Sequence, residues 1–359
     1  MKAMVLAAGV GSRLDPLTAQ LPKPLVPVAN IPVMEHIVNL LKRHGVDDII
    51  ANLHYLPEKL IEYFQDGSRD DVRIQFRKEE KLSGDAGGVR YCRDFLDGDT
   101  FIVLMGDLLT DADLSRVIEE HKRKGALATI GLKRVKDVSH FGVALLDNQG
   151  FIKGFQEKPK AQDALSDLAS TGIYILEPEV FEHMPKSGDY GFGRQLFPKL
   201  VAEGLPVLGV EVGSYWSDVG TIEQYALSNF DVLMGRLHVS LPGYRKVVYG
   251  PYNVFLAEGA SLAPTVNVRA NAIIGKNAHL GAGVELVGNV VIGDNCRVDD
   301  YAYIKDSILW SSMVVAADQR LENQILTSAG LTSVKAVDGD TKAFELIQTQ
   351  VRYQAWACV

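Results

Sequence analysis

Short apolar runs alternate with stretches of helical spacing along the N-terminal part of the chain. Residues 3–8, 49–53 and 101–105 are apolar runs of strand length, while 34–43 and 113–124 carry apolar residues at the spacing of one helix face. Strands that alternate with helices predict an α/β domain in which helices cover both faces of a mostly parallel sheet. Ligands of such domains bind beyond the carboxyl ends of the strands.

A different pattern begins at residue 254, where apolar residues recur every six positions as far as 316. The position before the repeating apolar residue is often Asn or Gly, which tolerate left-handed backbone at corners. One short strand per hexad, with two apolar columns inward, predicts a parallel β-helix. The pattern resembles the left-handed hexapeptide-repeat helix. The first column runs from Val254 to Ile308 and Val314, and the second, two residues later, runs from Leu256 to Trp310 and Ala316.

These two patterns divide the chain. We expect the α/β domain over 1–235, a linker over 236–253, the β-helix over 254–319 and a tail over 320–359. The linker is predicted from Pro242-Gly243-Tyr244 and Gly250-Pro251-Tyr252, which are typical of turns.

A candidate phosphate loop follows the first apolar run, with the sequence Gly9-Val10-Gly11-Ser12-Arg13. Glycines let the backbone approach a ligand with its N–H groups facing phosphate oxygens. Arg13 adds a fixed positive fork, and Lys23, held between two prolines, adds a point charge. The dinucleotide fingerprint is excluded because Leu14 stands at its third glycine, and the Gly-Lys-Ser/Thr of the Walker loop is absent. For the glycines alone, an ordinary strand–turn is the alternative.

The whole string, including Pro16-Leu17-Thr18 and Pro22-Lys23-Pro24, resembles the signature of the sugar-1-phosphate nucleotidylyltransferases, the enzymes that make nucleotide sugars. Matches to this family continue in order over most of residues 1–230. The resemblance implies a Rossmann-like nucleotidyltransferase domain with a mixed, mostly parallel sheet. It also implies a nucleotide site that includes a glycine-rich stretch over 83–88 and consists of Leu6, Ala8, Gly9, Gly11, Ser12, Arg13, Lys23, Gly84, Asp85 and Gly87.

Two aspartates are candidate metal ligands. Asp107 lies just past the run 101–105, where the active site of a parallel sheet is expected, although an aspartate there can also cap the next segment. Asp218 lies in Tyr215-Trp216-Ser217-Asp218-Val219-Gly220-Thr221. By resemblance, Asp107 and Asp218 hold Mg²⁺, a hard ion that favours carboxylate and phosphate oxygens.

A further motif, Phe155-Gln156-Glu157-Lys158-Pro159, concerns the sugar phosphate. Glu157 can accept hydrogen bonds from sugar hydroxyls and Lys158 can pair with a phosphate, while a surface ion pair is the alternative. The family's Phe-x-Glu-Lys-Pro motif favours the first interpretation. The resemblance implies a sugar-phosphate site of Gly142, Glu157, Lys158, Thr171 and Gly172, and a catalytic set of Arg13, Lys23, Asp107, Lys158 and Asp218.

Composition indicates which partners and which cellular compartment to expect. The 359 residues include 37 Lys and Arg against 45 Asp and Glu, a net charge of −8, which argues against non-specific binding to nucleic acid. No run approaches the ~20 apolar residues of a membrane span, and the N-terminus has no signal-peptide pattern. Cys92, Cys296 and Cys358 are too far apart for a metal or disulfide pattern. We expect a cytoplasmic protein with neither a nucleic-acid nor a membrane partner.

The expected reaction is the Mg²⁺-dependent transfer of a nucleotidyl group from a nucleoside triphosphate to a sugar 1-phosphate. The fused hexapeptide domain most resembles the mannose-1-phosphate guanylyltransferases, which implies GTP and mannose 1-phosphate. The alternatives are UTP, dTTP or ATP with glucose 1-phosphate, a catalytically silent subunit that binds nucleotide sugars, and an acyltransferase, for which His279 alone is a weak candidate base. We expect the β-helix to brace the catalytic domain or to form homo-oligomers.

Overall fold

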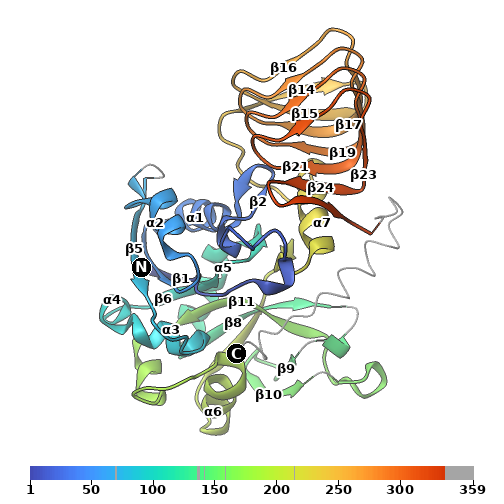
Figure 1. The fold of residues 1–359 in the computed structure, drawn as a ribbon. Helices are drawn as coiled ribbons and strands as arrows, with labels where there is room; N and C mark the ends of the chain where they lie inside the picture. The colour runs from blue at the N-terminus through green and yellow to red at the C-terminus, as the bar shows by residue number, and fades with distance from the viewer. Residues whose placement is uncertain (69–70, 136–137, 141, 158, 214, 336–359) are drawn as a thin grey trace.

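The computed structural model describes residues 1–68, 71–135, 138–140, 142–157, 159–213 and 215–335. Figure 1 shows an α/β domain with the β-helix standing on one side of it. Most of the predicted tail, residues 336–359, lies outside the described residues. Within the described ranges, no helix combines the length and the apolar character needed to cross a membrane.

The α/β domain is built on a nine-stranded mixed sheet, in the order β10-β9-β11-β6-β1-β4-β5, with β8 also paired to β11 and β12 paired to β8. Strands β6, β1, β4 and β5 run parallel, whereas β11 runs antiparallel to β6 and β8. This confirms the predicted mixed sheet. The strands are β1 (Lys2–Leu6), β4 (Asp48–Leu53), β5 (Arg73–Lys78), β6 (Phe101–Met105), β8 (Ala128–Arg134), β9 (Gly142–Leu146), β10 (Ile152–Glu157), β11 (Leu168–Leu176) and β12 (Val207–Glu211).

Each face of this sheet has its own apolar core. Ala3 and Val5 of β1 join the core under α1, α2 and α5, whereas Met4 and Leu6 join the core under α3, α4 and α6. Successive strand residues point to opposite faces, so a strand buried on both sides has a continuous apolar sequence. The helices are α1 (Val33–Arg43), α2 (Pro57–Phe64), α3 (Asp85–Tyr91), α4 (Arg93–Leu96), α5 (Leu114–Lys124), α6 (Phe197–Ala202) and α7 (Ile222–Leu233).

The hexapeptide region is a β-helix of stacked parallel strands. Residues one coil apart lie opposite each other, as Val254 does to Ala272 and Ala272 to Val290. These residues and their neighbours two positions on, such as Ile274, are buried inside the coils, as the two columns predicted. One sheet contains β15 (Tyr252–Ala257), β17 (Asn267–Ile274), β19 (Glu285–Ile292), β21 (Tyr303–Leu309) and β24 (Gln324–Thr327), and another contains β16 (Ser261–Leu262), β18 (His279–Leu280), β20 (Arg297–Val298) and β22 (Val314–Val315).

The predicted columns are wrong for the last repeats. Val287 lies opposite Lys305 but Val290 lies opposite Ser307. The coil that contains Lys305 and Ser307 is therefore one residue shorter, at the corner between these two residues, than the coil before it. Asp306 occupies the corner with a φ of 43°, and its Oδ1 accepts a hydrogen bond from the Asn289 N–H at 3.0 Å. The inward positions therefore move by one residue. Leu309 and Val315 are inward, whereas Ile308 packs in a different core, Trp310 is half-buried, and Val314 and Ala316 are exposed.

The segment expected as a linker contains a strand. β14 (Tyr244–Tyr249) pairs antiparallel with β15 and forms the edge of the larger β-helix sheet. Strands also continue beyond residue 319, as β23 (Arg320–Glu322), β24 and β25 (Gly330–Ser333). The period of six did not predict β14 or the strands after residue 319, because their pairing depends on turns and on contacts between coils.

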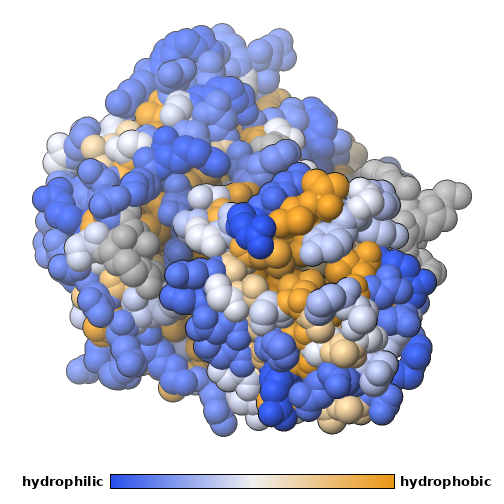
Figure 2. Space-filling view, turned by 90° about the horizontal axis from the view of Figure 1, so that it is seen from above, coloured by the Kyte–Doolittle hydropathy of each residue, from blue (hydrophilic) through white to orange (hydrophobic). Residues whose placement is uncertain are grey.

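The far end of the β-helix is its least buried part. The inward residues of the first coil, Ala260, Leu262, Val266 and Val268, are only partly buried. Figure 2 shows a largely hydrophilic surface from this side, with an apolar area over the β-helix.

Candidate functional site

The predicted phosphate loop leaves the carboxyl end of β1, between the ends of β4 and β6. Leu6 and Ala8 are buried, while Gly9, Ser12 and Arg13 are exposed to solvent. Gly11 has a φ of 73°, and a Cβ there would lie 2.9 Å from the Lys23 Cβ. Glycine is required at this position because of both the left-handed backbone and the close approach.

Lys23 lies beside Asp107. It begins a short 3-10 helix, η2 (Lys23–Leu25), and is only 8% exposed. Its Nζ donates to Asp107 Oδ2 at 2.5 Å. Asp107 is held next to the phosphate loop because the preceding Gly106 N–H donates to the Leu6 carbonyl at 2.8 Å.

Asp218 reaches the same place through strand pairing. β13 (Trp216–Ser217) pairs antiparallel with β7 (Leu109–Thr110), which brings the two aspartates together from distant parts of the chain. Burial raises the pKa of Asp218 to about 6, the charges of Lys23 and Arg13 lower this pKa, and the charge of Asp107 raises it. These four ionisable side chains, predicted from separate motifs, therefore lie within electrostatic reach of one another.

The donor set fits a divalent ion that is shared with a substrate. Asp218 is 2% exposed, and its Oδ1 has no hydrogen-bond partner among the described residues. A buried carboxylate oxygen without a partner is costly, and a cation would satisfy it. In the described part of the chain, no group of three or more His, Cys, Asp or Glu is arranged so that it could hold a metal ion. Two carboxylates suit Mg²⁺, which commonly takes one or two carboxylates and completes its shell with water and phosphate oxygens.

The glycine-rich stretch over 83–88 is packed against the segment that contains Tyr190. Gly84 has a φ of 79°, and a Cβ there would lie 2.5 Å from the Tyr190 carbonyl oxygen, which accepts the Gly87 N–H at 2.9 Å. The Asp85 carboxylate points inward, because its Oδ1 accepts the N–H groups of Ala86 and Phe192, each at 2.7 Å. Burial raises its pKa to about 6. The side chain of Asp85 thus anchors the stretch.

Sequence reasoning missed two buried polar residues that connect these loops. Asn52, in β4, accepts the Ala7 N–H at 3.0 Å and donates to Glu79 Oε1 at 2.6 Å. Glu79 Oε2 accepts both the N–H and the hydroxyl of Ser83. This chain of contacts ties the start of the phosphate loop to the glycine-rich stretch. The available signal was an asparagine inside the apolar run 49–53, where a polar side chain needs a partner.

On the predicted sugar side, Gly142 begins β9 and lies opposite Glu157 at the end of β10. Lys158 lies outside the described residues. Gly172, with a φ of 76°, lies where the register of β11 against β8 shifts. Thr171 is fully buried, and its hydroxyl donates to the Gly131 carbonyl at 2.8 Å. Bulges of this kind are common beside active sites.

The Thr171 carbonyl accepts the indole N–H of Trp216 at 2.8 Å. Trp216 is 8% exposed and belongs to the apolar core. This contact links the bulge in β11 to the strand that precedes Asp218.

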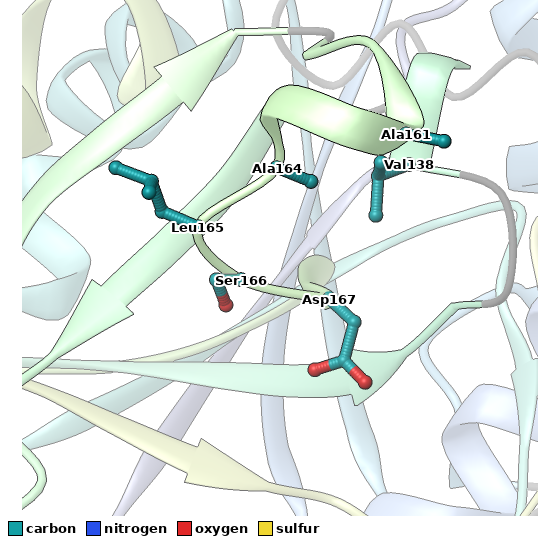
Figure 3. Close-up of a pocket in the computed structure, with 6 residues that line it drawn as sticks. All are labelled: Val138, Ala161, Ala164, Leu165, Ser166 and Asp167. Carbon is teal, nitrogen blue, oxygen red and sulfur yellow. The ribbon is translucent and has the colours of Figure 1, made fainter.

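An open pocket lies at the edge of the domain, among the segments around η4 (Val138–His140) and η5 (Ala161–Asp163) (Figure 3). Its polar lining includes Asp167, whose Oδ1 already accepts from Arg134 at 2.6 Å. Among the described residues that line the pocket there is no lysine or arginine, so they do not supply the cations that a polyphosphate requires. Its lining residues are Val138, Ala161, Ala164, Leu165, Ser166 and Asp167.

Comparison with known proteins shows which family the chain belongs to. The family model described as nucleotidyl transferase matches residues 2–233, and the bacterial transferase hexapeptide model, of six repeats, matches residues 271–306. A UTP–glucose-1-phosphate uridylyltransferase of Synechocystis is 36% identical, over 99% of this chain and 95% of that protein. A mannose-1-phosphate guanylyltransferase of Mycobacterium tuberculosis is 31% identical, over 78% of this chain and 77% of that protein.

A solved structure from Bacillus anthracis, named as a candidate glucose-1-phosphate thymidylyltransferase, is similar with a TM-score of 0.58. It is 28% identical and covers 64% of this chain and 94% of its own. The predicted resemblance to the sugar-1-phosphate nucleotidylyltransferases is thereby confirmed. This chain belongs to the nucleotidyl transferase family and carries a hexapeptide-repeat domain after its catalytic domain.

Proposed function

We propose that this chain transfers a nucleotidyl group from a nucleoside triphosphate to a sugar 1-phosphate and releases pyrophosphate. The observation that carries the proposal is the buried carboxyl of Asp218, which lacks a hydrogen-bond partner for Oδ1 among the described residues and lies in the field of two cations, Lys23 and Arg13. Two carboxylates beside two cations meet the needs of a polyphosphate and a divalent ion.

In the proposed reaction, an oxygen of the sugar phosphate attacks the α-phosphorus in line, and the bond from that phosphorus to the pyrophosphate oxygen breaks. The nucleophile is already an anion, so the reaction needs neither a covalent intermediate nor a general base. Arg13 and Lys23 neutralise the triphosphate and the leaving pyrophosphate. Mg²⁺, held by Asp107 and Asp218, supplies further charge neutralisation when it is bound. Catalysis then consists of positioning and electrostatic stabilisation.

The remaining predicted residues divide between the two substrates. The backbone of the phosphate loop and of Gly84 and Gly87 contacts the nucleotide, and Asp85 shapes that contact from inside the protein. Lys158 pairs with the sugar phosphate, Glu157 accepts hydrogen bonds from sugar hydroxyls, and the bulge at Gly172 lines the sugar pocket.

For the substrate pair we propose GTP and mannose 1-phosphate. Support comes from the mannose-1-phosphate guanylyltransferases of Mycobacterium tuberculosis and Arabidopsis thaliana, at 31% and 29% identity. The second candidate is UTP with glucose 1-phosphate, which is favoured by the Synechocystis relative because it matches 99% of this chain.

A pyrophosphate-release screen tests these proposals. GTP, UTP, dTTP, CTP and ATP are each combined with mannose 1-phosphate and glucose 1-phosphate in the presence of Mg²⁺. We expect the fastest release from GTP with mannose 1-phosphate; faster release from UTP with glucose 1-phosphate would replace the first pair by the second. Release from no pair would overturn the enzymatic proposal in favour of the silent subunit. Homo-oligomer formation stays a prediction, which light scattering after size exclusion tests.

The variant Asp107→Ala, assayed with the best pair, tests the site. Removing this charged contact should lower turnover by a factor of about 10² to 10³ while the protein stays folded. Circular dichroism provides the folding control. Near-normal turnover would remove Asp107 from the catalytic set.

A further inference from the structure

A stripe of apolar residues runs down the outside of the β-helix and packs against the α/β domain. It has one residue per coil, each between two inward positions, and each is at most 1% exposed: Ile273, Val291, Ile308 and Ile325. Figure 1 shows α7 between the β-helix and the rest of the α/β domain. Tyr225, Ala226 and Phe230 of α7 share one apolar core with the stripe.

The same core contains close sequence neighbours of all four charged groups of the site. Leu14 follows Arg13, and Val219 follows Asp218; Val26 lies three residues after Lys23, and Leu109 two after Asp107. The core between the domains therefore packs directly behind the proposed phosphate and metal site. Interiors are close-packed, so a displacement of the β-helix is transmitted to these segments.

Hydrogen bonds cross the same interface. The Trp310 indole N–H donates to the Tyr225 hydroxyl at 2.8 Å, and Asn30 Nδ2 donates to the Ile292 carbonyl at 2.8 Å. The neighbouring Ala29 N–H donates to Asn229 Oδ1 on α7 at 2.8 Å. One set of contacts thus joins the β-helix to α7, which follows Asp218, and to the hairpin that follows Lys23.

Strained backbone lies at both ends of this set. Ala29 and Asn30, the turn between β2 (Pro27–Val28) and β3 (Ile31–Pro32), have φ values of 51° and 64°. Val219, directly after Asp218, has a φ of 41°, which is unfavourable for a β-branched residue. Such conformations persist only where the surroundings hold them in place. Ala29 and Val219 are both at most 1% exposed, and both belong to the core shared with the stripe.

The short corner at Asp306 makes the Trp310 contact possible. Under a strict period of six, Trp310 would have faced the interior of the β-helix. Because the register moves by one residue, the indole instead lies outside and reaches Tyr225. A departure from the repeat at this point serves the contact between the domains.

We propose that Tyr225 and Trp310 are positioning residues, through which the β-helix holds Asp218 and Lys23 in place for nucleotidyl transfer. This inference rests on the proposed function. The β-helix is then part of the catalytic apparatus through its contacts with α7 and with the hairpin that follows Lys23.

The test uses Tyr225→Phe and Trp310→Phe in the full chain, with Tyr63→Phe as the matched control. Tyr63 lies on α2, and its hydroxyl donates to Glu35 at 2.6 Å, so the control also removes one hydroxyl hydrogen bond. We expect kcat to fall about tenfold and the Mg²⁺ concentration for half-maximal turnover to rise about tenfold in both interface variants, with the KM for GTP or UTP little changed. A folded pair of interface variants that matches the control in both quantities would overturn the proposal.

Amide hydrogen exchange separates this result from a failure of the proposed function. In Tyr225→Phe we expect faster exchange in peptides that cover 216–220 and 23–32 than in Tyr63→Phe, whether or not the wild-type protein turns over any substrate pair. Unchanged exchange in those peptides overturns the positioning role. If the wild-type protein turns over no substrate pair but Tyr225→Phe still shows the faster exchange, the result would count against the enzymatic function alone and would support the positioning role.

Discussion

Two aspartates in different parts of the α/β domain, the half-buried Asp85 and the buried Asp218, differ in their partners. Burial raises the pKa of both Asp85 and Asp218 to about 6. Asp85 accepts two backbone N–H groups, whereas Oδ1 of Asp218 has no hydrogen-bond partner in the described part of the chain. Asp85 is therefore satisfied inside the protein, and Asp218 needs a group from outside. Burial alone does not identify a functional carboxylate; the missing partner does.

Among these variants, Asp218→Asn should have the largest effect on turnover. We expect turnover to fall about a thousandfold, because a neutral amide cannot replace the carboxylate beside the metal. The free energy of unfolding should rise by roughly 1–3 kcal/mol at pH 8 in the absence of metal, because an unfavourably buried charge is removed. Denaturant titration with a chelator measures the stability.

The pH dependence supplies the control for this prediction. Between about pH 4 and 6, native Asp218 keeps a proton that the unfolded chain has released, so its contribution to stability is lost as the pH rises through 6. The stability gain of Asp218→Asn should therefore be small near pH 4 and complete above pH 6 to 7. A gain that does not change with pH would contradict the assignment of the raised pKa to Asp218.

Lys23→Met should have a smaller effect on turnover, about a hundredfold, because one cation of the site remains. The charge of Lys23 lowers the pKa of Asp218. Its removal should therefore move the loss of unfolding free energy that accompanies ionisation of Asp218 to higher pH. The measurement is the unfolding free energy against pH without metal. Lys276→Met, at an exposed position of the β-helix, is the control, and an equal loss of turnover there would exclude a specific role for Lys23.

Asp85→Ala should affect stability more than chemistry. The variant leaves the buried N–H groups of Ala86 and Phe192 without their acceptor, which should cost roughly 1–3 kcal/mol, partly offset at pH 8 by removal of a buried charge. We expect kcat/KM to fall by less than about tenfold, mainly because the KM for the nucleotide rises. Asp85→Asn retains the acceptor oxygen and should be less destabilised. A loss of turnover as large as that of Asp218→Asn would show that the two carboxylates do not differ as described.

Local patterns in the sequence were sufficient for the outline of the protein. Alternating apolar runs predicted the α/β domain, the period of six predicted the β-helix, and glycines and charges that follow the strands predicted the groups of the site. These features depend on neighbouring residues: which side chains share a face, and where a chain can turn. The family resemblance extended them to Asp218, whose position within the sequence carries little information by itself.

Only the tertiary structure decided which of these groups meet and what surrounds them. The pairing of β7 with β13, the inward turn of Asp85 and the contact of Asn52 with Glu79 all join residues distant in sequence. One residue fewer at the corner of Asp306 was enough to move Trp310 from the predicted interior to the interface with α7. Strand register and burial are properties of the whole packed chain, and a shift of one residue turns every following side chain to the other face.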